Sequence, residues 1–435
     1  MQLSVPELIG LFRAQGCKAL YAKRLAANDN SKNQIYFGPG FGALNLLPNK
    51  GVVVNNEAKT PNFKAGLDFF WLNDQGQIHQ APGAQLILYP DYPEVRFSGF
   101  LQRATEAPNA LLRSREPNRV LFLGIRADER IIGYVQQYPD QLPEVDGDEV
   151  KHNGVFSEIP IGAEGNKTNR ELLLTALRKI HLQGWIDSKQ FRKDGTIGPC
   201  VAQNCGGYTL EAELGVSKNS NGIPDYLGYE VKQHDERNFD HVGSHAVTLL
   251  TPNPEEGYFR EHGAAKFIRK YGYPDKSGIP DRLNFGGVHR VGEVNKLTGL
   301  KLSLLGFNPI KGTFALHGSL ALLDQNNEVA AAWPFPKFLE HWRTKHANAV
   351  YVPSQKREVE PRAYRYGHSV RIGEHTDFIT LLKAFHSGAV YYDPGLKLEH
   401  ASTPEAAHKV RNQFRINSQK LGALYKKFDR VNVLL

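Results

Sequence analysis

Residues 224–232 restrict the fold and the chemistry of this chain more than any other stretch. A turn that contains proline and glycine leads into a run of alternating apolar and charged residues, which predicts a β-strand. Strand side chains alternate between two faces, so Glu230 and Lys232 share one face and Val231 points to the other. Asp225, in the preceding turn, can approach Glu230. Two converging carboxylates favour a hard cation such as Mg²⁺, and an ammonium group beside them suits metal-assisted phosphodiester hydrolysis.

Parts of the same pattern occur in two other places. Residues 278–281 repeat the sequence Gly-Ile-Pro-Asp, but glycine and valine stand where the second carboxylate and the lysine are needed. A full copy, which ends in Glu149 and Lys151, lies among polar residues that offer little apolar surface for a strand. The copy at Glu230 has apolar neighbours that can anchor a rigid strand, and metal ligands require such rigidity. The alternative for Glu230 and Lys232 is an ordinary ion pair.

A third carboxylate precedes the predicted catalytic strand. Glu211 lies in a run, residues 206–215, that is predicted to form a helix. From such a helix its carboxylate could contact the metal ion or the waters around it. Glu213 is a rival two residues later, and an exposed helix glutamate without a catalytic role is the alternative.

The charge of the chain favours an anionic partner. The formal net charge is +8 and the pI about 9.1, with 41% hydrophobic and 23% charged residues. Nucleic acid is the leading candidate because it presents a dense row of phosphates. The alternative is a mildly basic protein that binds no nucleic acid. At 435 residues the chain is long enough for two or three domains.

Cysteine usage and hydropathy predict a cytoplasmic protein without a membrane segment. The three cysteines, Cys17, Cys200 and Cys205, are odd in number and lack zinc-type spacing, which argues against a disulfide framework or a structural zinc site. Residues 1–16 resemble an amphipathic helix rather than a signal sequence. No uninterrupted apolar stretch is long enough to span a bilayer.

Residues 1–160 are predicted to form a mainly β domain. One helix is followed by many short strands separated by turn signals, a spacing typical of a small barrel or sandwich. A polar, turn-rich stretch over residues 138–170 predicts the domain boundary. The predicted strands cover residues 34–37, 51–54, 67–72, 85–89, 119–125 and 131–135.

Two polar loops in this region carry candidate DNA contacts. Their side chains match base edges, since arginine suits guanine, asparagine suits adenine and carboxylates suit cytosine. The alternative is a pair of solvated loops. The candidates are Lys23, Arg24, Asn28 and Asp29 in the first loop, and Glu94 and Arg96 in the second.

Residues 170–435 are predicted to form an α/β domain. Thr168 or Asn169 can cap a helix over residues 172–182, where apolar residues recur at helical spacing. Further strands are predicted over residues 247–250, 300–305 and 330–332, and further helices over residues 335–346, 378–386 and 404–427.

This second region also contains candidates for reading bases. Arg365, His368 and Arg371 lie in a predicted loop that could enter the major groove. A second group consists of Arg282, His289 and Arg290. Phosphate contact or solvation is the alternative for both groups. The basic residues of the predicted helix over residues 404–427 would follow the DNA backbone or form a solvated face.

The first polar loop resembles a known DNA-binding domain. Lys-Arg-Leu at residues 23–25 and Ala-Asn-Asp at residues 27–29 are similar to the corresponding stretch of EcoRII-type effector domains. That resemblance implies a DNA-binding pseudobarrel which grips DNA with two arms. Lys23, Arg24, Asn28 and Asp29 would belong to the first arm, and Glu94 and Arg96 to the second.

The catalytic stretch resembles a nuclease family. Tyr-Thr-Leu-Glu at residues 208–211, together with Pro-Asp and Glu-Val-Lys at residues 224–232, is similar to the MvaI/BcnI restriction endonucleases of the PD-(D/E)XK superfamily, which are related in fold to the repair nickase MutH. The resemblance implies that Asp225, Glu230 and the Val231 carbonyl bind Mg²⁺. It further implies that Lys232 activates the attacking water and that Glu211 supports the site.

Both resemblances together imply a two-domain α+β protein. A mainly β DNA-binding pseudobarrel over residues 1–160 would precede a MutH-like α/β nuclease domain over residues 170–435. The expected activity is that of a monomeric type II (IIE-like) restriction endonuclease, which cuts double-stranded DNA at a CCNGG-type site, CCWGG in particular. The first domain would bind a second site, and the host would hold a cognate methyltransferase. A MutH-like nickase and a non-catalytic DNA-binding regulator are the alternatives.

Overall fold

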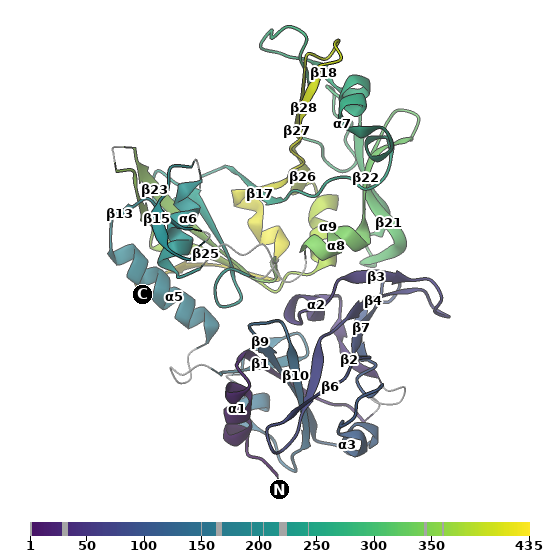
Figure 1. The fold of residues 1–435 in the computed structure, drawn as a ribbon, viewed down its shortest axis with the longest axis vertical. Coiled ribbons are helices and arrows are strands. Elements are labelled where there is room, and N and C mark those ends of the chain that lie inside the picture. The colour runs from purple at the N-terminus through teal and green to yellow at the C-terminus, as the bar shows by residue number, and fades with distance from the viewer. Residues whose placement is uncertain are drawn as a thin grey trace.

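The computed structural model describes residues 2–27, 34–148, 150–161, 168–192, 194–202, 204–216, 224–241, 243–342, 346–358 and 361–435. It is a mixed α+β structure dominated by sheets, and no sheet formed by these residues closes into a barrel. In Figure 1 the N-terminal part, in purple, occupies the bottom of the molecule, and the teal to yellow remainder lies above it.

Two sheets make up most of the N-terminal part. α1 (Val5–Ala14) begins with a capping box between Ser4 and Glu7, and it buries Leu8 and Phe12. The seven-stranded sheet has the order β11 (His152–Asn153), β12 (Phe156–Ile159), β1 (Cys17–Arg24), β9 (Arg119–Arg126), β10 (Ile131–Gln137), β5 (Phe69–Leu72), β6 (Ile78–Gln80). The five-stranded sheet has the order β2 (Gln34–Pro39), β8 (Glu94–Ser98), β7 (Gln85–Tyr89), β4 (Asn62–Gly66), β3 (Val52–Asn55).

The strands predicted in this part are confirmed as β2, β3, β5, β7, β9 and β10. Burial alternates over the first residues of β2, whereas β9 and β10 are buried along most of their length. Short helices connect them: α2 (Gly42–Leu46), α3 (Asn109–Arg113) and α4 (Pro143–Asp146). The pseudobarrel and the domain limits at residues 160 and 170 stay predictions.

The sheet that carries the predicted catalytic strand has a central strand, β23 (Ala349–Arg357). β16 (Glu230–Asp235) pairs with it in parallel, and β24 and β25 pair with it in antiparallel directions. α5 (Asn169–Leu182) begins at Thr168, whose side chain accepts from the Glu171 N–H, as expected of a helix cap. The other strands are β13 (Ile186–Asp187), β24 (Ala363–Tyr366), β25 (Ser369–Glu374) and β30 (Lys427–Asn432).

Four smaller sheets and several helices complete the described chain. The sheets are β14 (Lys189–Phe191) with β15 (Ile197–Pro199); β17 (Ala246–Leu250), β29 (Phe414–Asn417) and β26 (Val390–Tyr392); β18 (Tyr273–Pro274), β19 (Leu283–Gly286), β27 (Gly395–Glu399) and β28 (Ala407–Lys409); and β20 (Lys301–Asn308), β21 (Thr313–Leu323) and β22 (Val329–Pro334). The helices are α6 (Cys205–Glu213), α7 (Tyr258–Tyr271), α8 (Phe335–Trp342), α9 (Phe378–His386) and the 3₁₀ helix η2 (Ser418–Leu424).

One hydrophobic core joins the N-terminal part to the rest of the chain. Phe314 of β21 packs its ring 5.4 Å from that of Phe41 and 5.9 Å from that of Phe63. Asn45 donates a buried hydrogen bond of 2.6 Å to the Thr376 carbonyl. These contacts hold the N-terminal sheets against the part that contains the predicted catalytic strand.

Three expectations from the sequence were wrong. Residues 404–427 do not form one helix, because Phe414 and Ile416 alternate with exposed neighbours and enter β29. The stretch around Arg371 is not a loop, since it forms the hairpin of β24 and β25. Cys200 and Cys205 form a disulfide, because a turn before α6 brings their Cα atoms to 5.7 Å. Among helices in the described ranges, none is long and apolar enough to cross a membrane.

Candidate active site

β16 is held on both faces. Tyr229 and Val231 belong to a buried apolar cluster that includes residues of α5 and α6. On the opposite face Glu230 lies near Tyr351, where burial, with a smaller contribution from the Glu230 charge, raises the pKa of the tyrosine to about 12. A strand packed in this way keeps its side chains in fixed directions, which a metal site requires.

Asp225, Glu230 and Lys232 gather at the start of this strand. Lys232 Nζ donates to Glu230 Oε1 at 2.7 Å, and the side chains of Lys232 and Glu230 are 27% and 3% exposed. Asp225 Oδ2 accepts a hydrogen bond of 2.9 Å from the backbone N–H of Val231, the residue between them. The turn and the strand therefore place Asp225 against the backbone of the residue between Glu230 and Lys232, and a catalytic role for the three side chains stays a prediction.

A tight turn fixes Asp225 in this position. Tyr226 and Tyr229 exchange backbone hydrogen bonds of 3.0 and 2.8 Å across it. Leu227 and Gly228, between them, have φ values of 49° and 82°. Glycine adopts a positive φ without strain, but a leucine there is unfavourable. Backbone strain thus lies two residues from a predicted metal ligand.

A buried ionic network lies behind the turn. Glu374 accepts hydrogen bonds from the Tyr229 hydroxyl and from Arg170. Lys151 Nζ, from the N-terminal part, lies 3.6 Å from Glu374 Oε1 and 3.2 Å from Glu158 Oε2. Burial opposes ionisation of Glu374, but the hydrogen bond from Tyr229 and the two cations outweigh it, so its pKa is lowered. The carboxylate therefore stays charged and connects the turn at residues 225–229 to the N-terminal part.

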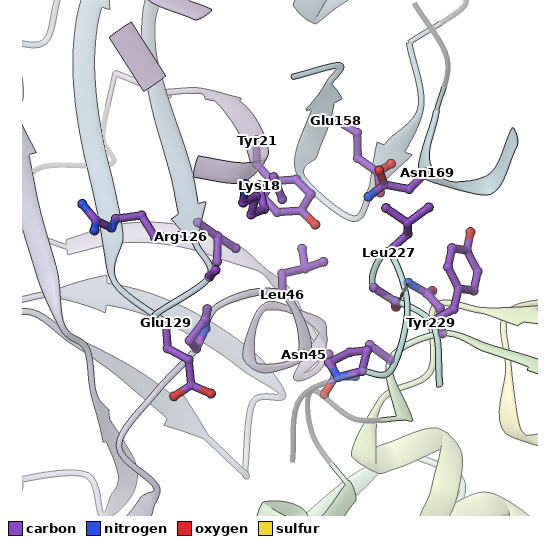
Figure 2. Close-up of a pocket in the computed structure, with 18 of the residues that line it drawn as sticks. Lys18, Tyr21, Asn45, Leu46, Arg126, Glu129, Glu158, Asn169, Leu227 and Tyr229 are labelled. Carbon is purple, nitrogen blue, oxygen red and sulfur yellow. Dashed lines mark hydrogen bonds between the residues drawn. The ribbon is translucent and has the colours of Figure 1, made fainter. Parts of the chain in front are cut away.

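A cavity of about 510 Å³ lies beside the turn that contains Asp225 and Leu227. Asp225 and Leu227 line it from the turn, and Tyr21 and Leu46 line it from the N-terminal part. Figure 2 shows Tyr21, Leu46 and Leu227 around one space, with Glu158 and Asn169 near its edge. The N-terminal sheets thus share a cavity with the predicted catalytic turn.

Glu211 lies in α6, which packs on the other side of β16. A Cβ atom at Gly206 would lie 2.9 Å from the side chain of Gln233, so the helix approaches β16 closely at that point. By strand alternation, Gln233 faces away from Glu230 and Lys232. Glu213, the alternative to Glu211 as the third carboxylate, forms an ion pair with Lys189. A supporting role for Glu211 stays a prediction.

The candidate DNA contacts of the N-terminal part are held by neighbours within the protein. Lys23 is 6% exposed and donates to the Arg24 carbonyl at 2.9 Å. Arg24 forms an ion pair with Asp146. Glu94 and Arg96 pair with each other at 2.8 Å on β8. Asn28 and Asp29 lie outside the described residues.

The candidate base-reading residues of the second region lie around the hairpin of β24 and β25. Arg365 donates to Gln355 Oε1 at 2.7 Å, and His368 Nε2 lies 3.3 Å from Asp240. Arg371 is buried, and burial lowers its pKa. A base-reading role for Arg365, His368 and Arg371 stays a prediction.

The second group of candidates is separate from this hairpin. Arg282 pairs with Glu399 at 2.5 Å. His289 is buried, with its ring nitrogens 2.8 Å from the Gly287 carbonyl and 2.9 Å from Thr298, and burial lowers its pKa to about 4. Such a histidine is a satisfied core residue in this structure.

The sequence interpretation missed a polar cluster further along β16. His234 follows Lys232 on the same face of the strand by alternation. Glu236 and His245 lie close to His234 in space. The spacing of these three residues in the sequence does not predict that they are neighbours. The continued alternation of charged residues beyond Lys232 was the one available signal.

Comparisons with known proteins identify the family of this chain. The model of the MvaI/BcnI restriction endonuclease family matches residues 174–425. Two solved structures are similar at low identity. MvaI in complex with cognate DNA substrate has 16% identity and a TM-score of 0.42, over 61% of this chain and 99% of that one. MvaI in the absence of DNA has 15% identity and a TM-score of 0.34, over 62% and 99%. No curated protein matches. Since the family model covers more than half of its length, the chain belongs to the MvaI/BcnI family of restriction endonucleases, which cleave DNA.

Proposed function

We propose that this protein is a Mg²⁺-dependent type II restriction endonuclease whose active site consists of Asp225, Glu230 and Lys232. The observation that carries the proposal is the contact of Lys232 Nζ with Glu230 Oε1 at 2.7 Å. Between these two residues, the backbone N–H of Val231 donates to Asp225 Oδ2 and so holds the second carboxylate beside the strand. Two carboxylates and a carbonyl are hard oxygen donors, and restriction endonucleases of this kind generally use divalent metal ions.

The proposed chemistry divides between the carboxylates and the lysine. Asp225, Glu230 and the Val231 carbonyl would hold Mg²⁺, which when bound stabilises negative charge on the scissile phosphate. Lys232, as a cation, would orient the attacking water and help it to lose its proton to the surrounding solvent, and it would stabilise the charge that develops on the phosphate. The water oxygen forms a bond to phosphorus in line with the bond that breaks, and the 3′ oxygen leaves. The products are a 5′-phosphate and a 3′-hydroxyl. Glu211 is a supporting carboxylate in this scheme.

The proposed DNA site is of the CCNGG type, CCWGG in particular, and the proposed enzyme is a monomer. Residues 1–160 would form an effector domain that binds a second copy of the site through Lys23, Arg24, Asn28, Asp29, Glu94 and Arg96. Arg365, His368 and Arg371 would contact bases in the nuclease part. A cognate methyltransferase in the host would protect its own DNA.

The catalytic assignment is tested with Lys232→Ala. Plasmid cleavage with Mg²⁺ should fall by about 10³-fold, since one positioned cationic or hydrogen-bonding group contributes that much to a developing charge. DNA binding in Ca²⁺, measured by gel shift, should persist. Lys356→Ala is the matched control, because Lys356 is half-exposed on the neighbouring strand and pairs with Glu358 at 2.9 Å. Equal loss in both variants would contradict the assignment.

The effector role is tested with plasmids that carry one or two copies of the site. Cleavage of the two-site plasmid should be several-fold faster, and added oligonucleotide with the site should accelerate cleavage of the one-site plasmid. Sequencing the ends of digested genomic DNA gives the site itself. Equal rates on both plasmids would remove the effector role, and nicked circles as the final product would favour a nickase.

A further inference from the structure

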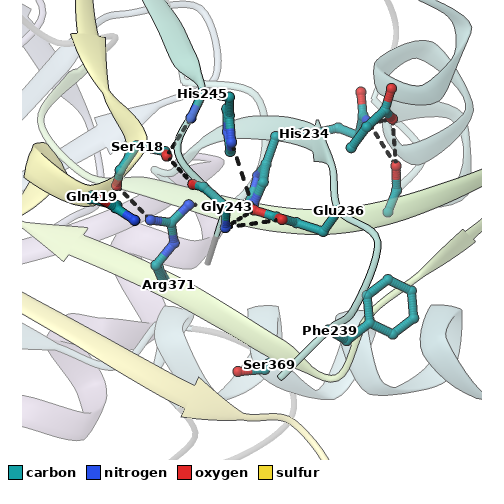
Figure 3. A network of polar contacts seen from close by, with 12 residues as sticks. His234, Glu236, Phe239, Gly243, His245, Ser369, Arg371, Ser418 and Gln419 are labelled. Carbon is teal, nitrogen blue, oxygen red and sulfur yellow. Dashed lines mark hydrogen bonds and ion pairs between the residues drawn. The ribbon is translucent and has the colours of Figure 1, made fainter. Parts of the chain in front are cut away.

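Three potential metal ligands meet where β16 ends and β17 begins. His234 lies in β16, Glu236 directly follows it, and His245 directly precedes β17. Figure 3 shows both imidazole rings beside the Glu236 carboxylate, with Arg371 and Ser418 next to them. The group shares no residue with the predicted nuclease site, and His234 lies about 7 Å beyond Lys232 on the same face of the strand at the usual rise per residue.

The spacing of the three side chains suits a tetrahedral ion. Glu236 Oε1 lies 3.6 Å from His234 Nε2 and 3.7 Å from His245 Nδ1. Ligand atoms at the usual zinc distances stand about 3.3 Å from one another in a tetrahedron. A small inward movement of each side chain would therefore complete three of the four positions.

Backbone hydrogen bonds already hold this arrangement. The N–H of Gly243 donates to both oxygens of Glu236, at 2.9 and 3.0 Å. The N–H of His245 donates to Ser418 Oγ at 3.1 Å. The side chains of His234 and Glu236 are 9% and 7% exposed. The loop between the two strands is thus closed before any ion binds, which lowers the cost of binding.

The two imidazoles are in the form that binds metals. Burial is the main cause that lowers the pKa of both His234 and His245, so the rings are neutral at pH 7. In addition, His234 Nδ1 and His245 Nε2 are buried and have no hydrogen-bond partner among the residues that the structure describes. These are the ring nitrogens opposite the two that lie near Glu236, so they are not themselves the ligand atoms. With the proton of each neutral ring on that nitrogen, His234 Nε2 and His245 Nδ1 keep the lone pairs that face Glu236.

The guanidinium of Arg371 lies next to this group and would repel a bound cation. Its Nη2 lies 3.3 Å from His234 Nε2, and its Nη1 donates to the Ser418 carbonyl at 2.6 Å. The negative charge of Glu236 offsets this guanidinium. Binding through Nε2 would replace the contact of Arg371 with His234 and leave its contact with Ser418. Metal binding and the position of Arg371 would therefore be coupled.

We propose that His234, Glu236 and His245 form a second metal site, which takes a transition-metal ion such as Zn²⁺ rather than Mg²⁺. Two imidazoles and one carboxylate are borderline ligands that favour Zn²⁺ or Co²⁺, whereas Mg²⁺ requires oxygen donors. The ion joins the end of β16 to the start of β17, and a water or a DNA group takes the fourth position. This site does not depend on the nuclease assignment.

The test is a Co²⁺ titration of the full chain after chelator treatment. Co²⁺ reports its own geometry, because tetrahedral Co²⁺ absorbs far more visible light than octahedral Co²⁺. The titration is made in a Glu230→Gln background, so that the nuclease site does not contribute. One tetrahedral Co²⁺ should bind per chain, Zn²⁺ should displace it, and excess Mg²⁺ should not.

Two variants and one control locate the ion. His245→Ala and Glu236→Gln should each weaken binding by at least about 100-fold, because even an outer hydrogen-bond partner of a ligand contributes 10- to 100-fold. Glu236→Gln keeps the shape of the side chain, so it also serves if His245→Ala does not fold. His241→Ala, an exposed histidine in the same connection, should bind as the parent does. Absence of a tetrahedral spectrum, or the same affinity in all variants, would overturn the proposal.

Discussion

The sequence Gly-Ile-Pro-Asp occurs at residues 222–225 and again at residues 278–281, and the two copies end in different surroundings. In the first, Asp225 Oδ2 accepts a hydrogen bond from the backbone of β16. In the second, the carboxylate oxygens of Asp281 accept from the backbone and the hydroxyl of Ser402, both at 2.9 Å. One aspartate therefore faces a buried strand, and the other closes an exposed loop.

The residues that follow each copy explain the difference. Glu230 and Lys232 stand on a strand packed on both faces. At the same spacing, the second copy has Gly286 and Val288, which offer neither a carboxylate nor an ammonium group. The four shared residues are therefore not enough to predict a catalytic site, and the proposed chemistry depends on the strand that follows the first copy.

Replacing the two aspartates separately should give the largest contrast. We expect Asp225→Asn to slow Mg²⁺-dependent cleavage by about 10³-fold, because it removes the charge of a proposed metal ligand. Asp281→Asn keeps an acceptor for Ser402 and should cleave within about twofold of the parent. Single-turnover cleavage of a short duplex measures both. Similar rates in the two variants would remove the distinction between the copies.

The second-largest effect should come from Glu374, whose ion pairs lie behind the turn of the first copy. Glu374→Gln leaves Arg170 and Lys151 near a neutral amide, so we expect a loss of about 3 kcal/mol in the free energy of unfolding at pH 7. The pKa of Glu374 is lowered from its ordinary value of 4.5. Its contribution is therefore present above pH 4.5 and is lost as the pH falls through the lowered value.

Urea unfolding at a series of pH values checks this dependence. The difference between the parent and Glu374→Gln should be constant from pH 7 to pH 5 and should shrink below about pH 4.5. Glu399→Gln, beside the second copy, is the control, since Glu399 pairs with Arg282 on the surface. Its effect should be much smaller at every pH. A pH-independent difference for Glu374→Gln would mean that packing, and not charge, is lost.

Local sequence was sufficient to predict several elements of this structure and insufficient for others. Alternation predicted β16, and the Thr168 cap predicted the start of α5, because both depend on neighbours in the chain. The hydrogen bond from Tyr229 to Glu374 joins residues that are 145 positions apart, and no local pattern encodes it. The meeting of His234 with His245 depends in the same way on how the intervening loop closes.

A smaller effect is expected from Asp281 in the loop of the second copy. Asp281→Ala removes both hydrogen bonds to Ser402 and places alanine at a φ of 52°. We expect a loss of about 1 to 2 kcal/mol in the free energy of unfolding, with unchanged cleavage. Thermal unfolding measures the first quantity, and hydrogen exchange at the Ser402 amide should become faster. A stability equal to that of the parent would mean that the loop is held by other contacts.

The smallest effect should come from the strained turn of the first copy. Leu227 has a φ of 49°, close to that of Asp281, but aspartate and asparagine tolerate this region and leucine does not. Leu227→Asn should therefore raise the free energy of unfolding by up to about 1 kcal/mol, less what is lost where Leu227 lines the cavity. Leu227→Ala is the control, because it shortens the side chain and keeps the strain. If both variants are destabilised equally, the packing of Leu227 against the cavity outweighs the strain. A gain confined to Leu227→Asn would place stored strain at the turn that follows Asp225 and not at Asp281.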